Sequence, residues 1–389
     1  VHYCVMRQAL PLLLLALLPM QGCTSEAAVQ ANPCSQPGVW LSHDGADGVR
    51  QADAVALIER LAANQVVLLG ETHDSAEDHR WQLHTLAQLH ARRPRLAIGF
   101  EMFPRRLQPV LDRWVVGELT EAEFLRETDW NRVWGYDARL YMPLFHYARM
   151  NRLPMLALNV ERSLVSAVDA HGWDAVPQAQ REGLTRPAMP PEEYRKLLRQ
   201  AFGHHSDKKQ DDAGFERFVQ AQATWDRAMA EGIAAYLARE PDALVVGIMG
   251  AGHVRYGHGV AHQLKDLGVR RVANLLTWDA QGHCRDFKAG LADAVYVVRA
   301  PQSEPPRLGI AMEPATGGVR IAQVTAGSVA ERSGLEAGDV VLEAAGVSLR
   351  SPEGLRQIVA RQAPGTWLPL KVRRDGRELE IVARFPPAP

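Results

Sequence analysis

The sequence predicts an α/β domain with a mostly parallel sheet, flanked by helices and carrying a helical insertion, followed by a small, mainly β domain. Apolar runs that look like buried strands alternate with amphipathic helical patterns, which is typical of parallel pairing in an open sheet. The proline-rich stretch RAPQSEPPRLG (Arg299–Gly309) then separates these patterns from short β-like runs with glycine turns. At 389 residues the chain is long enough for two domains.

The elements of the first domain can be placed in order. Five apolar runs are the predicted strands: Gln65–Leu69, Leu96–Phe100, Met155–Leu158, Ala243–Met249 and Arg271–Leu276. Apolar residues at helical spacing predict helices over Asp74–Arg93, Asp137–Asn151 and Asp212–Glu240, the first capped by Asp74 or Ser75. The span Val160–Asp242 is too long for a simple crossover, so we expect a mostly helical insertion that acts as a lid or a dimer surface.

Composition narrows the function classes. The chain is 47% hydrophobic and 23% charged, which is ordinary for a globular protein. Its formal net charge of −1 gives no electrostatic case for binding nucleic acid.

The N-terminus has the pattern of a targeting segment. Arg7 precedes an apolar run, Ala9–Met20, with the proportions of a signal peptide rather than of a membrane span. Gly22 directly before Cys23 resembles a bacterial lipoprotein signal, in which the cysteine is acylated after cleavage. The resemblance implies a signal over residues 1–23, a tether over 24–37 and a lipid anchor at Cys23, with simple secretion as the alternative. Met6 is the expected start of translation.

Two further inferences follow from this signal. Thr24 after Cys23 resembles sorting to the outer membrane, so the expected location is the cell envelope, on the periplasmic face of the outer membrane. Lipidation at Cys23 leaves Cys34 and Cys284, which flank the first domain, in an oxidising compartment. Two cysteines allow one pairing, so we expect a disulfide that pins the ends of the domain, with two free thiols as the alternative.

Polar side chains follow four of the predicted strands. In an open parallel sheet, ligands bind beyond the carboxyl ends of the strands, so these side chains are expected to converge. Singly, each could be a cap, a salt-bridge partner or a turn residue, but Gly-x-x-His occurs after two separate strands, at Gly70–His73 and Gly250–His253, and this repetition favours a site. The converging residues are Glu71, His73, Asp74, Glu101, Asn159, Glu161, His253 and Tyr256.

Several motifs in this region resemble one family. LLGETHD, GFEMF, GYDARLYMPLFHYARMNRLPMLALNVE and GAGHVRYGHGV, within Gly38–Thr277, resemble the ChaN-type haem-binding lipoproteins, which are similar to Tiki, TraB and erythromycin esterase proteins. The resemblance implies a domain over residues 38–300 that binds haem for haem or iron uptake, with a tyrosine on the iron and a stacked haem pair across a homodimer. The cofactor-binding residues it implies are Glu71, His73, Tyr136, Tyr141, Asn159, His253 and Tyr256. His204 and His205 are interpreted as part of a solvated loop.

The sequence departs from the family pattern at Ser75–His79 and at Ala261, and two other readings stay open. In the preferred reading the protein is not an enzyme. The first alternative is a metal-dependent hydrolase, similar to Tiki proteases or to the esterases, with Glu71, His73, Glu101 and His253 as catalytic residues. His73, His253 and Glu71 would then hold zinc, manganese or cobalt. The second is a scaffold in which these residues are structural.

The C-terminal region resembles a bacterial PDZ domain. RLGIAM and AGSVAERSGLEAGDVVLEAAG carry the resemblance, which implies a linker at 301–306 and a mainly β domain with two helices at 307–386. It also implies a groove for the C-terminus of a peptide or protein, which would add a strand to the sheet edge. The alternatives are core packing and a groove filled by the chain itself. The peptide-binding residues it implies are Arg307, Leu308, Gly309 and Ile310 in the carboxylate loop, and Leu355 and Ile358 in the pocket.

Overall fold

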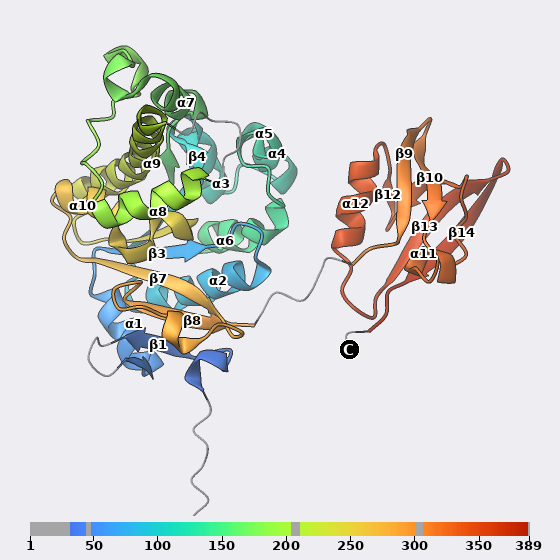
Figure 1. The fold of residues 1–389 in the computed structure, drawn as a ribbon, viewed down its shortest axis with the longest axis horizontal. Coiled ribbons are helices and arrows are strands. Elements are labelled where there is room, and N and C mark those ends of the chain that lie inside the picture. The colour runs from blue at the N-terminus through green and yellow to red at the C-terminus, as the bar shows by residue number, and fades with distance from the viewer. Residues whose placement is uncertain (1–31, 44–47, 204–210, 300–305, 388–389) are drawn as a thin grey trace, which may run out of the picture.

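A computed structural model describes residues 32–43, 48–203, 211–299 and 306–387. The signal segment with Cys23, the pair His204-His205 and nearly all of the expected linker lie outside these ranges. The described chain forms one sheet of eight strands and one of six, each with its own helices (Figure 1). This arrangement confirms the predicted fold class.

The larger sheet is parallel over most of its width. Its strand order is β2-β1-β8-β7-β3-β6-β4-β5, with β8 through β5 parallel and β1 and β2 antiparallel at one edge. Five strands correspond to the predicted runs: β3 (Val66–Glu71), β4 (Leu96–Pro104), β5 (Met155–Asn159), β6 (Leu244–Gly250) and β7 (Val272–Asp279). Sequence reasoning missed the other three: β1 (Trp40–His43), β2 (Val49–Gln51) and β8 (Ala294–Val298).

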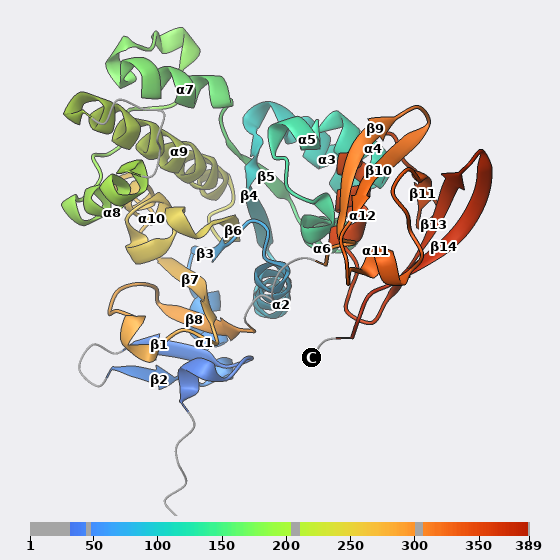
Figure 2. The ribbon, with the colours of Figure 1, turned by 45° about the vertical axis from the view of Figure 1, so that its right-hand side comes forward.

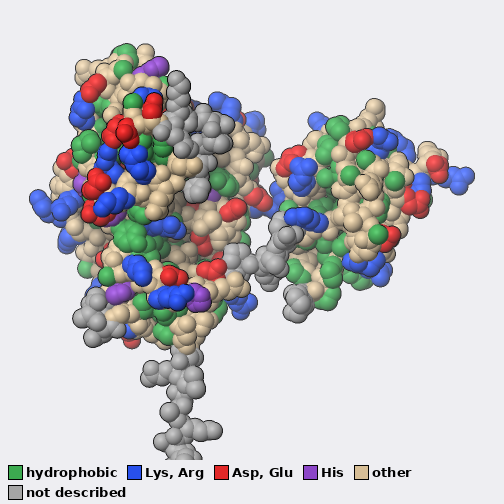
Figure 3. Space-filling model, in the orientation of Figure 1, with side chains coloured by type: hydrophobic (Ala, Val, Ile, Leu, Met, Phe, Trp, Pro, Cys, Tyr) green, Lys and Arg blue, Asp and Glu red, His purple; other side chains and the backbone are tan. Residues whose placement is uncertain are grey.

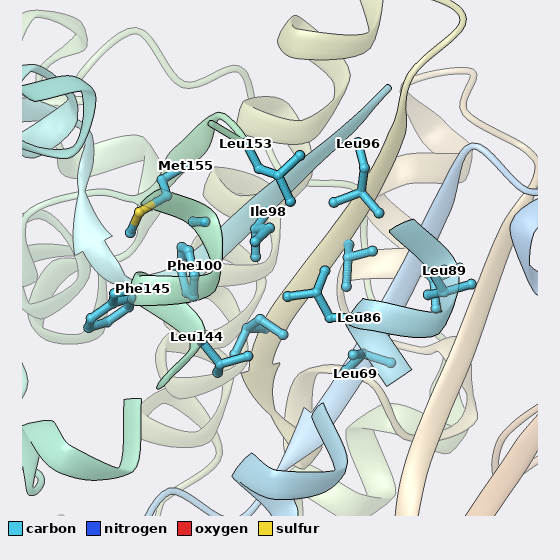
Figure 4. Close-up of a cluster of buried hydrophobic side chains, with 14 of the residues drawn as sticks. Leu69, Leu86, Leu89, Leu96, Ile98, Phe100, Leu144, Phe145, Leu153 and Met155 are labelled. Carbon is cyan, nitrogen blue, oxygen red and sulfur yellow. The ribbon is translucent and has the colours of Figure 1, made fainter. Parts of the chain in front are cut away.

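Helices cover both faces of this sheet. On one face β3 and β4 pack against α2 and α6 through Leu69, Leu86, Ile98 and Phe145, as Figure 4 shows. That face holds α1 (Ala54–Ala62), α2 (Ala76–Arg92), η2 (Arg105–Leu107), α3 (Gln108–Val116), α4 (Glu121–Glu127), α5 (Trp130–Val133) and α6 (Ala138–Met150). The other face is covered by α9 (Asp212–Arg239) and α10 (Val260–Asp266). Since β3, β4 and β6 are buried on both faces, their side chains are almost all apolar until the strands end.

The helical insertion is part of the fold rather than a separate flap. Its long helix α9 packs against the sheet, and α7 (Arg162–His171) packs on α9. Helix α8 (Glu192–Gly203) packs on α9 through a cluster that includes Tyr194 and Phe215. Two short turns, η3 (Trp173–Ala175) and η4 (Gln178–Gln180), connect α7 to α8.

A disulfide joins Cys34 in η1 (Pro33–Ser35) to Cys284 in η7 (Cys284–Asp286), the pairing expected from the sequence. It links the start of the described chain to the segment just before β8, and so ties the antiparallel edge of the sheet to its parallel part. Across the described ranges, no helix combines the length and the apolar character needed to cross a bilayer.

The smaller sheet is antiparallel, in the order β14-β13-β11-β10-β9, with β12 paired to β11 (Figure 2). Leu308, Ile321 and Leu370 are among its core residues. An ion pair at 3.6 Å between Asp137 and Arg361 connects this domain to the first. Its elements are β9 (Ile310–Ala315), β10 (Gly318–Val324), α11 (Val329–Arg332), β11 (Val340–Ala344), β12 (Val347–Ser348), α12 (Pro352–Ala360), β13 (Trp367–Arg374) and β14 (Arg377–Arg384).

Candidate functional site at the carboxyl edge of the sheet

The last residue of β3 begins the site. Glu71 pairs in register with Gly250 of β6, and its side chain is fully buried. One carboxylate oxygen, Oε1, lies 2.7 Å from Nδ1 of His73 and accepts a hydrogen bond from the Tyr141 hydroxyl at 3.3 Å. The strand therefore ends by fixing an imidazole just beyond it.

Glu101, on the strand β4, contributes the second carboxylate of the site. β4 leaves its regular register with β5 between Phe100 and Pro104, which turns Glu101 toward the end of β6. There Oε2 accepts a hydrogen bond of 2.6 Å from the Gly250 N–H. A side chain at Gly250 is excluded, because a Cβ there would lie 2.9 Å from Cε1 and 3.2 Å from Nε2 of His73. The glycine lets the imidazole and the carboxylate approach the same backbone.

His253, in η5 (Ala251–His253), lies between two carboxylates. Its Nδ1 lies 2.7 Å from Oδ1 of Asp226 on α9, and its Nε2 lies 3.5 Å from Oε1 of Glu101. The Tyr194 hydroxyl of α8 donates to the other oxygen of Asp226 at 3.2 Å. Gly259 also packs here, since a Cβ on it would lie 2.8 Å from Oδ1 of Asp226. Helical insertion and sheet edge thus meet at this imidazole.

The charged groups around His253 shift one another's pKa values. Burial lowers the pKa of His253, but the charges of Glu101 and Asp226 raise it well above its usual value. Burial likewise raises the pKa of Glu101, but the charge of His253 and the Gly250 N–H outweigh it and lower that pKa. His253 thus lies between two acidic side chains that favour its charged form, although burial raises the pKa of Asp226 above its usual value.

His73 is the more accessible histidine, with 27% of its side chain exposed. Its ring lies 4.7 Å from that of Trp134 and 5.0 Å from that of Tyr136, between centroids. Burial lowers the pKa of His73, but the hydrogen bond and the charge of Glu71 raise it by more. Within the described residues its Nε2 has no hydrogen-bond partner, so this nitrogen is open to a ligand or a proton.

Two residues expected to bind a cofactor are positioned differently. Tyr141 is fully buried, and burial and the charge of Glu71 raise its pKa far above its usual value, so its phenol stays protonated. Tyr141 faces Glu71 and is not part of the lining of the cleft described below, and its contact with a cofactor stays a prediction. The Asn159 amide donates to the Glu101 carbonyl at 2.9 Å and its oxygen accepts from the Val160 N–H, so Asn159 anchors the strand ends.

The expected metal site is not formed. In the described part of the chain, no three His, Cys, Asp or Glu side chains are grouped so that they could hold a metal ion. Nδ1 of His73 and Nδ1 of His253 are paired with different carboxylates, Glu71 and Asp226, and Nε2 of His253 lies 3.5 Å from Oε1 of Glu101. The residues His73, His253 and Glu71 therefore belong to separate ion pairs rather than to one coordination shell.

A cleft of about 2490 Å³ opens beside these residues, and its lining includes parts of both domains. Tyr136 and Tyr256 line it, and Tyr136 is 39% exposed. Tyr256, in η6 (Arg255–Gly257), adopts a left-handed φ of 59° and stacks on His258 with 5.5 Å between ring centroids. Leu197 and Leu198 of α8 form an apolar wall, and Figure 3 shows hydrophobic side chains gathered between α8 and β7.

Two of the five arginines that line this cleft have no side-chain partner among the described residues. Arg255 and Arg299 are both exposed there, and the side chain of neither forms an ion pair or a hydrogen bond with another described residue. Uncompensated guanidinium groups in a cleft suit a carboxylate or phosphate ligand.

In the second domain, the loop before β9 packs tightly. Gly309 has a φ of +80°, and a Cβ on it would lie 2.3 Å from Cβ of Ser328. The carbonyls of Leu308 and Gly309 accept from the Ala330 and Thr325 N–H groups. β9 is the last strand of its sheet, so its outer edge has no partner strand among the described residues.

The remaining predicted peptide-binding residues of this domain divide between surface and core. Ile310 is partly exposed, and Arg307 lines the cleft described above. Leu355 is fully buried and Ile358 nearly so, because both face the core from α12. Only the small part of these side chains that is not buried in the core can contribute to the floor of a groove.

The fold and this edge define an open α/β protein with a buried carboxylate–imidazole cluster and an appended antiparallel domain. The chain belongs to the family described as haem-binding uptake, Tiki superfamily, ChaN, whose model matches residues 57–264, more than half of the chain. A PDZ domain model matches residues 306–383. Both resemblances found in the sequence are thereby confirmed.

Three solved structures are similar to parts of this chain. A structure entitled "Cofacial heme binding to ChaN of Campylobacter jejuni" is 17% identical, covers 66% of this chain and 96% of that chain, and has a TM-score of 0.53, which shows the shared fold. The HtrA3 PDZ domain bound to a phage-derived ligand is 24% identical over 20% of this chain and 82% of its own, with a TM-score of 0.19. A serine endoprotease from Yersinia pestis is 22% identical over 21% of this chain and 29% of its own, with a TM-score of 0.19. No curated protein matches the chain.

Sequence reasoning missed several residues of the site. Asp226 and Tyr194 complete the environment of His253, and Arg255 and Arg299 line the cleft. The sequence could have indicated Asp226, because it is a single acidic residue in a stretch of α9 that is otherwise mostly apolar and buried. Nothing in the sequence singles out Tyr194, since an aromatic residue on an amphipathic helix usually packs in the hydrophobic core.

Proposed function

We propose that this protein binds haem in the cleft at the carboxyl edge of its parallel sheet and serves haem or iron handling in the cell envelope. Membership of a haem-binding uptake family supports the proposal, as does the fold shared with ChaN of Campylobacter jejuni, whose title describes cofacial haem binding. The observation that carries it is the cleft, which joins an apolar wall, two tyrosines and two uncompensated arginines.

The chemistry of the lining fits a porphyrin. Its flat macrocycle needs an apolar surface, which Leu197 and Leu198 of α8 supply, and its two propionates need cations, which Arg255 and Arg299 supply. Iron bound there supplies Lewis-acid and redox chemistry, and tyrosine is among its protein ligands.

Tyr256 is the proposed iron ligand. It is partly exposed, and its hydroxyl makes no hydrogen bond with a described residue. Its left-handed backbone costs energy, which proteins retain mainly at functional positions. Tyr136 lines the same cleft without that strain, which makes it the matched control.

The test is a haem titration of the chain that begins at residue 24, followed by visible absorption. We expect saturable binding, a ligand band that is lost in Tyr256→Phe and kept in Tyr136→Phe, and at least tenfold weaker binding in Arg255→Ala. Light scattering with and without haem tests the proposed homodimer. No saturable spectral change would overturn haem binding, whereas loss of the band only in Tyr136→Phe would overturn the ligand assignment.

The proposed location is the periplasmic face of the outer membrane, with the chain anchored by acylated Cys23. Support comes from the Gly22-Cys23 pattern after a signal-like run. Metabolic labelling with palmitate and membrane fractionation test it. Wild type is expected to label and to fractionate with outer membranes, and Cys23→Ala to do neither. An unlabelled, soluble wild-type protein would favour simple secretion.

The PDZ domain is proposed to bind the free carboxyl terminus of a peptide or protein. The unpaired edge of β9 and the loop Arg307–Ile310 support this, because a peptide could add a strand there with its carboxylate at the loop. A library of peptides with free and amidated C-termini tests it with the full chain. Binders that lose affinity on amidation are expected, and equal affinity for both forms would overturn carboxylate recognition.

A second candidate function is ester or peptide hydrolysis with His73 as general base. The specific observation is its geometry: Nδ1 is held by Glu71, while Nε2 is unpartnered beside Gly250. Hydrolysis of a chromogenic ester that is lost in His73→Ala but kept in Tyr256→Phe would favour it over haem binding.

A further inference from the structure

The PDZ domain contacts the first domain at one end of α12. Arg361 directly follows this helix, and its Nε lies 3.6 Å from Oδ2 of Asp137, which caps the start of α6. Asp137 also pairs with Arg139 at 2.8 Å. The side chains of Asp137 and Arg361 are each 35% exposed. Because an exposed ion pair contributes little free energy and is screened by salt, this contact between the domains is weak and reversible.

The same end of α12 borders the cleft. Gln357 and Ala360 are exposed, lie within about one turn of Arg361 and line the cleft together with it. The other face of the helix carries Leu355 and Ile358 into the core of the PDZ domain. Figure 1 shows α12 on the side of this domain that faces the first domain. The helix therefore packs on its own domain with one face and forms a wall of the cleft with the other.

In the first domain, the contact lies one residue from the aromatic lining of the cleft. Tyr136 directly precedes Asp137, and its ring lies 5.0 Å from that of His73 between centroids. The carbonyl of Tyr136 accepts a hydrogen bond of 2.6 Å from Nε1 of Trp130, which fixes this segment to the first domain. Since Tyr136 and α12 line one cleft, a ligand that fills the cleft here contacts both domains.

We propose that the PDZ domain is a reversible cover of the cleft, held in place by Asp137 and Arg361, and that the ligand of the cleft binds to both domains at once. The inference rests on the proposed function for the identity of that ligand, haem, whereas the docking of the domains does not depend on it. A ligand that contacts both walls favours the docked arrangement, and by thermodynamic linkage docking strengthens its binding. Arg361 is thus a positioning residue for the haem site.

Small-angle X-ray scattering of the haem-free chain that begins at residue 24, at low and high salt, tests the docking. Arg361→Glu places a carboxylate against Asp137. Arg356→Glu is the control, because it makes the same change of charge on α12 at a residue that pairs with Glu353 and does not line the cleft. We expect the maximum dimension of wild type and of Arg356→Glu to increase with salt, and that of Arg361→Glu to be large at both salt concentrations. Equal dimensions of wild type and Arg361→Glu at low salt would overturn the docking.

Haem titration of the same three proteins tests the role of the cover. Haem should reduce the maximum dimension of wild type at high salt. Arg361→Glu should bind haem about fivefold more weakly than wild type, and Arg356→Glu as wild type does. An unchanged haem affinity in an undocked Arg361→Glu would overturn the cover. Absence of haem binding in all three proteins would overturn the proposed function, and the scattering would still decide whether the domains dock.

Discussion

Nδ1 of His253 and Oδ1 of Asp226 lie 2.7 Å apart, although the two residues belong to different elements and are 27 positions apart in the sequence. The contact joins the end of β6 to the middle of α9, so the helical insertion and the sheet share one buried charge pair. Tyr194 extends the contact to α8. The geometry of the site therefore depends on how the helical insertion packs against the sheet.

Replacing Asp226 tests this dependence. Asp226→Asn removes one partner of a buried pair and leaves the His253 imidazolium with Glu101 alone, so the free energy of unfolding should fall by about 3–5 kcal/mol. Urea unfolding followed by circular dichroism measures it. Asp212→Asn, at the exposed start of the same helix, should change it by less than about 0.5 kcal/mol. Equal effects of the two variants would contradict a stabilising pair.

Gly250 and Gly252 form a second matched pair. Gly250→Ala would place a methyl group 2.9 Å from Cε1 of His73 and should displace that ring, at a cost of about 1–3 kcal/mol. Gly252→Ala meets open space and should fold and bind as wild type does. Unfolding and haem titration of both variants measure the difference. If both bind haem as wild type does, the position of His73 is irrelevant to binding.

The Cys34–Cys284 disulfide should stabilise the first domain. It closes a loop with a sequence separation of 250 residues, and opening such a loop costs about 2–4 kcal/mol. Cys284→Ser should lower the midpoint of urea unfolding, and a reductant should have the same effect on wild type but none on the variant. Equal sensitivity of the two proteins to reductant would show that the bond is absent in solution.

Stability of the PDZ domain should depend on pH through Asp339. Burial raises the pKa of this carboxyl, but hydrogen bonds from Arg374 and from the Glu336 N–H outweigh it and lower the pKa below its usual value. A lowered folded-state pKa means that the stabilisation is present above the unfolded value, about 3.9, and is lost as the pH falls through the folded value.

Hydrogen exchange of β10, β11 and β13 in the full chain, read by mass spectrometry, measures this. Near neutral pH, Asp339→Asn should exchange faster than wild type, by about 1.5–3 kcal/mol of opening free energy, as expected for hydrogen bonds to a charged group. The difference should shrink as the pH falls below about 4. A difference that stayed constant with pH would rule out ionised Asp339 as its source.

The sequence by itself determined the buried strands of the first domain and the boundary of the second domain. β3, β4 and β6 were readable because strands buried on both faces are runs of apolar residues, and the proline-rich break marked the second domain. The convergence of Glu71, His73, Glu101 and His253 was also predictable, because parallel strands bring their carboxyl ends to one edge. β1 and β2 were missed because they are short, lie at the sheet edge and lack a clear alternating pattern.

Only the tertiary structure decided what each side chain does. Tyr141 lies within a matching motif, yet it is buried behind Glu71 and not in the cleft. Asp226 and His79 lie on helices and contact residues just beyond the strand ends. The spacing of residues along a helix does not predict which strand end a helical side chain will contact. The physical reason is that strand order and helix packing set contacts between distant residues. Hydrogen bonds across those contacts then determine which nitrogen of each imidazole is free.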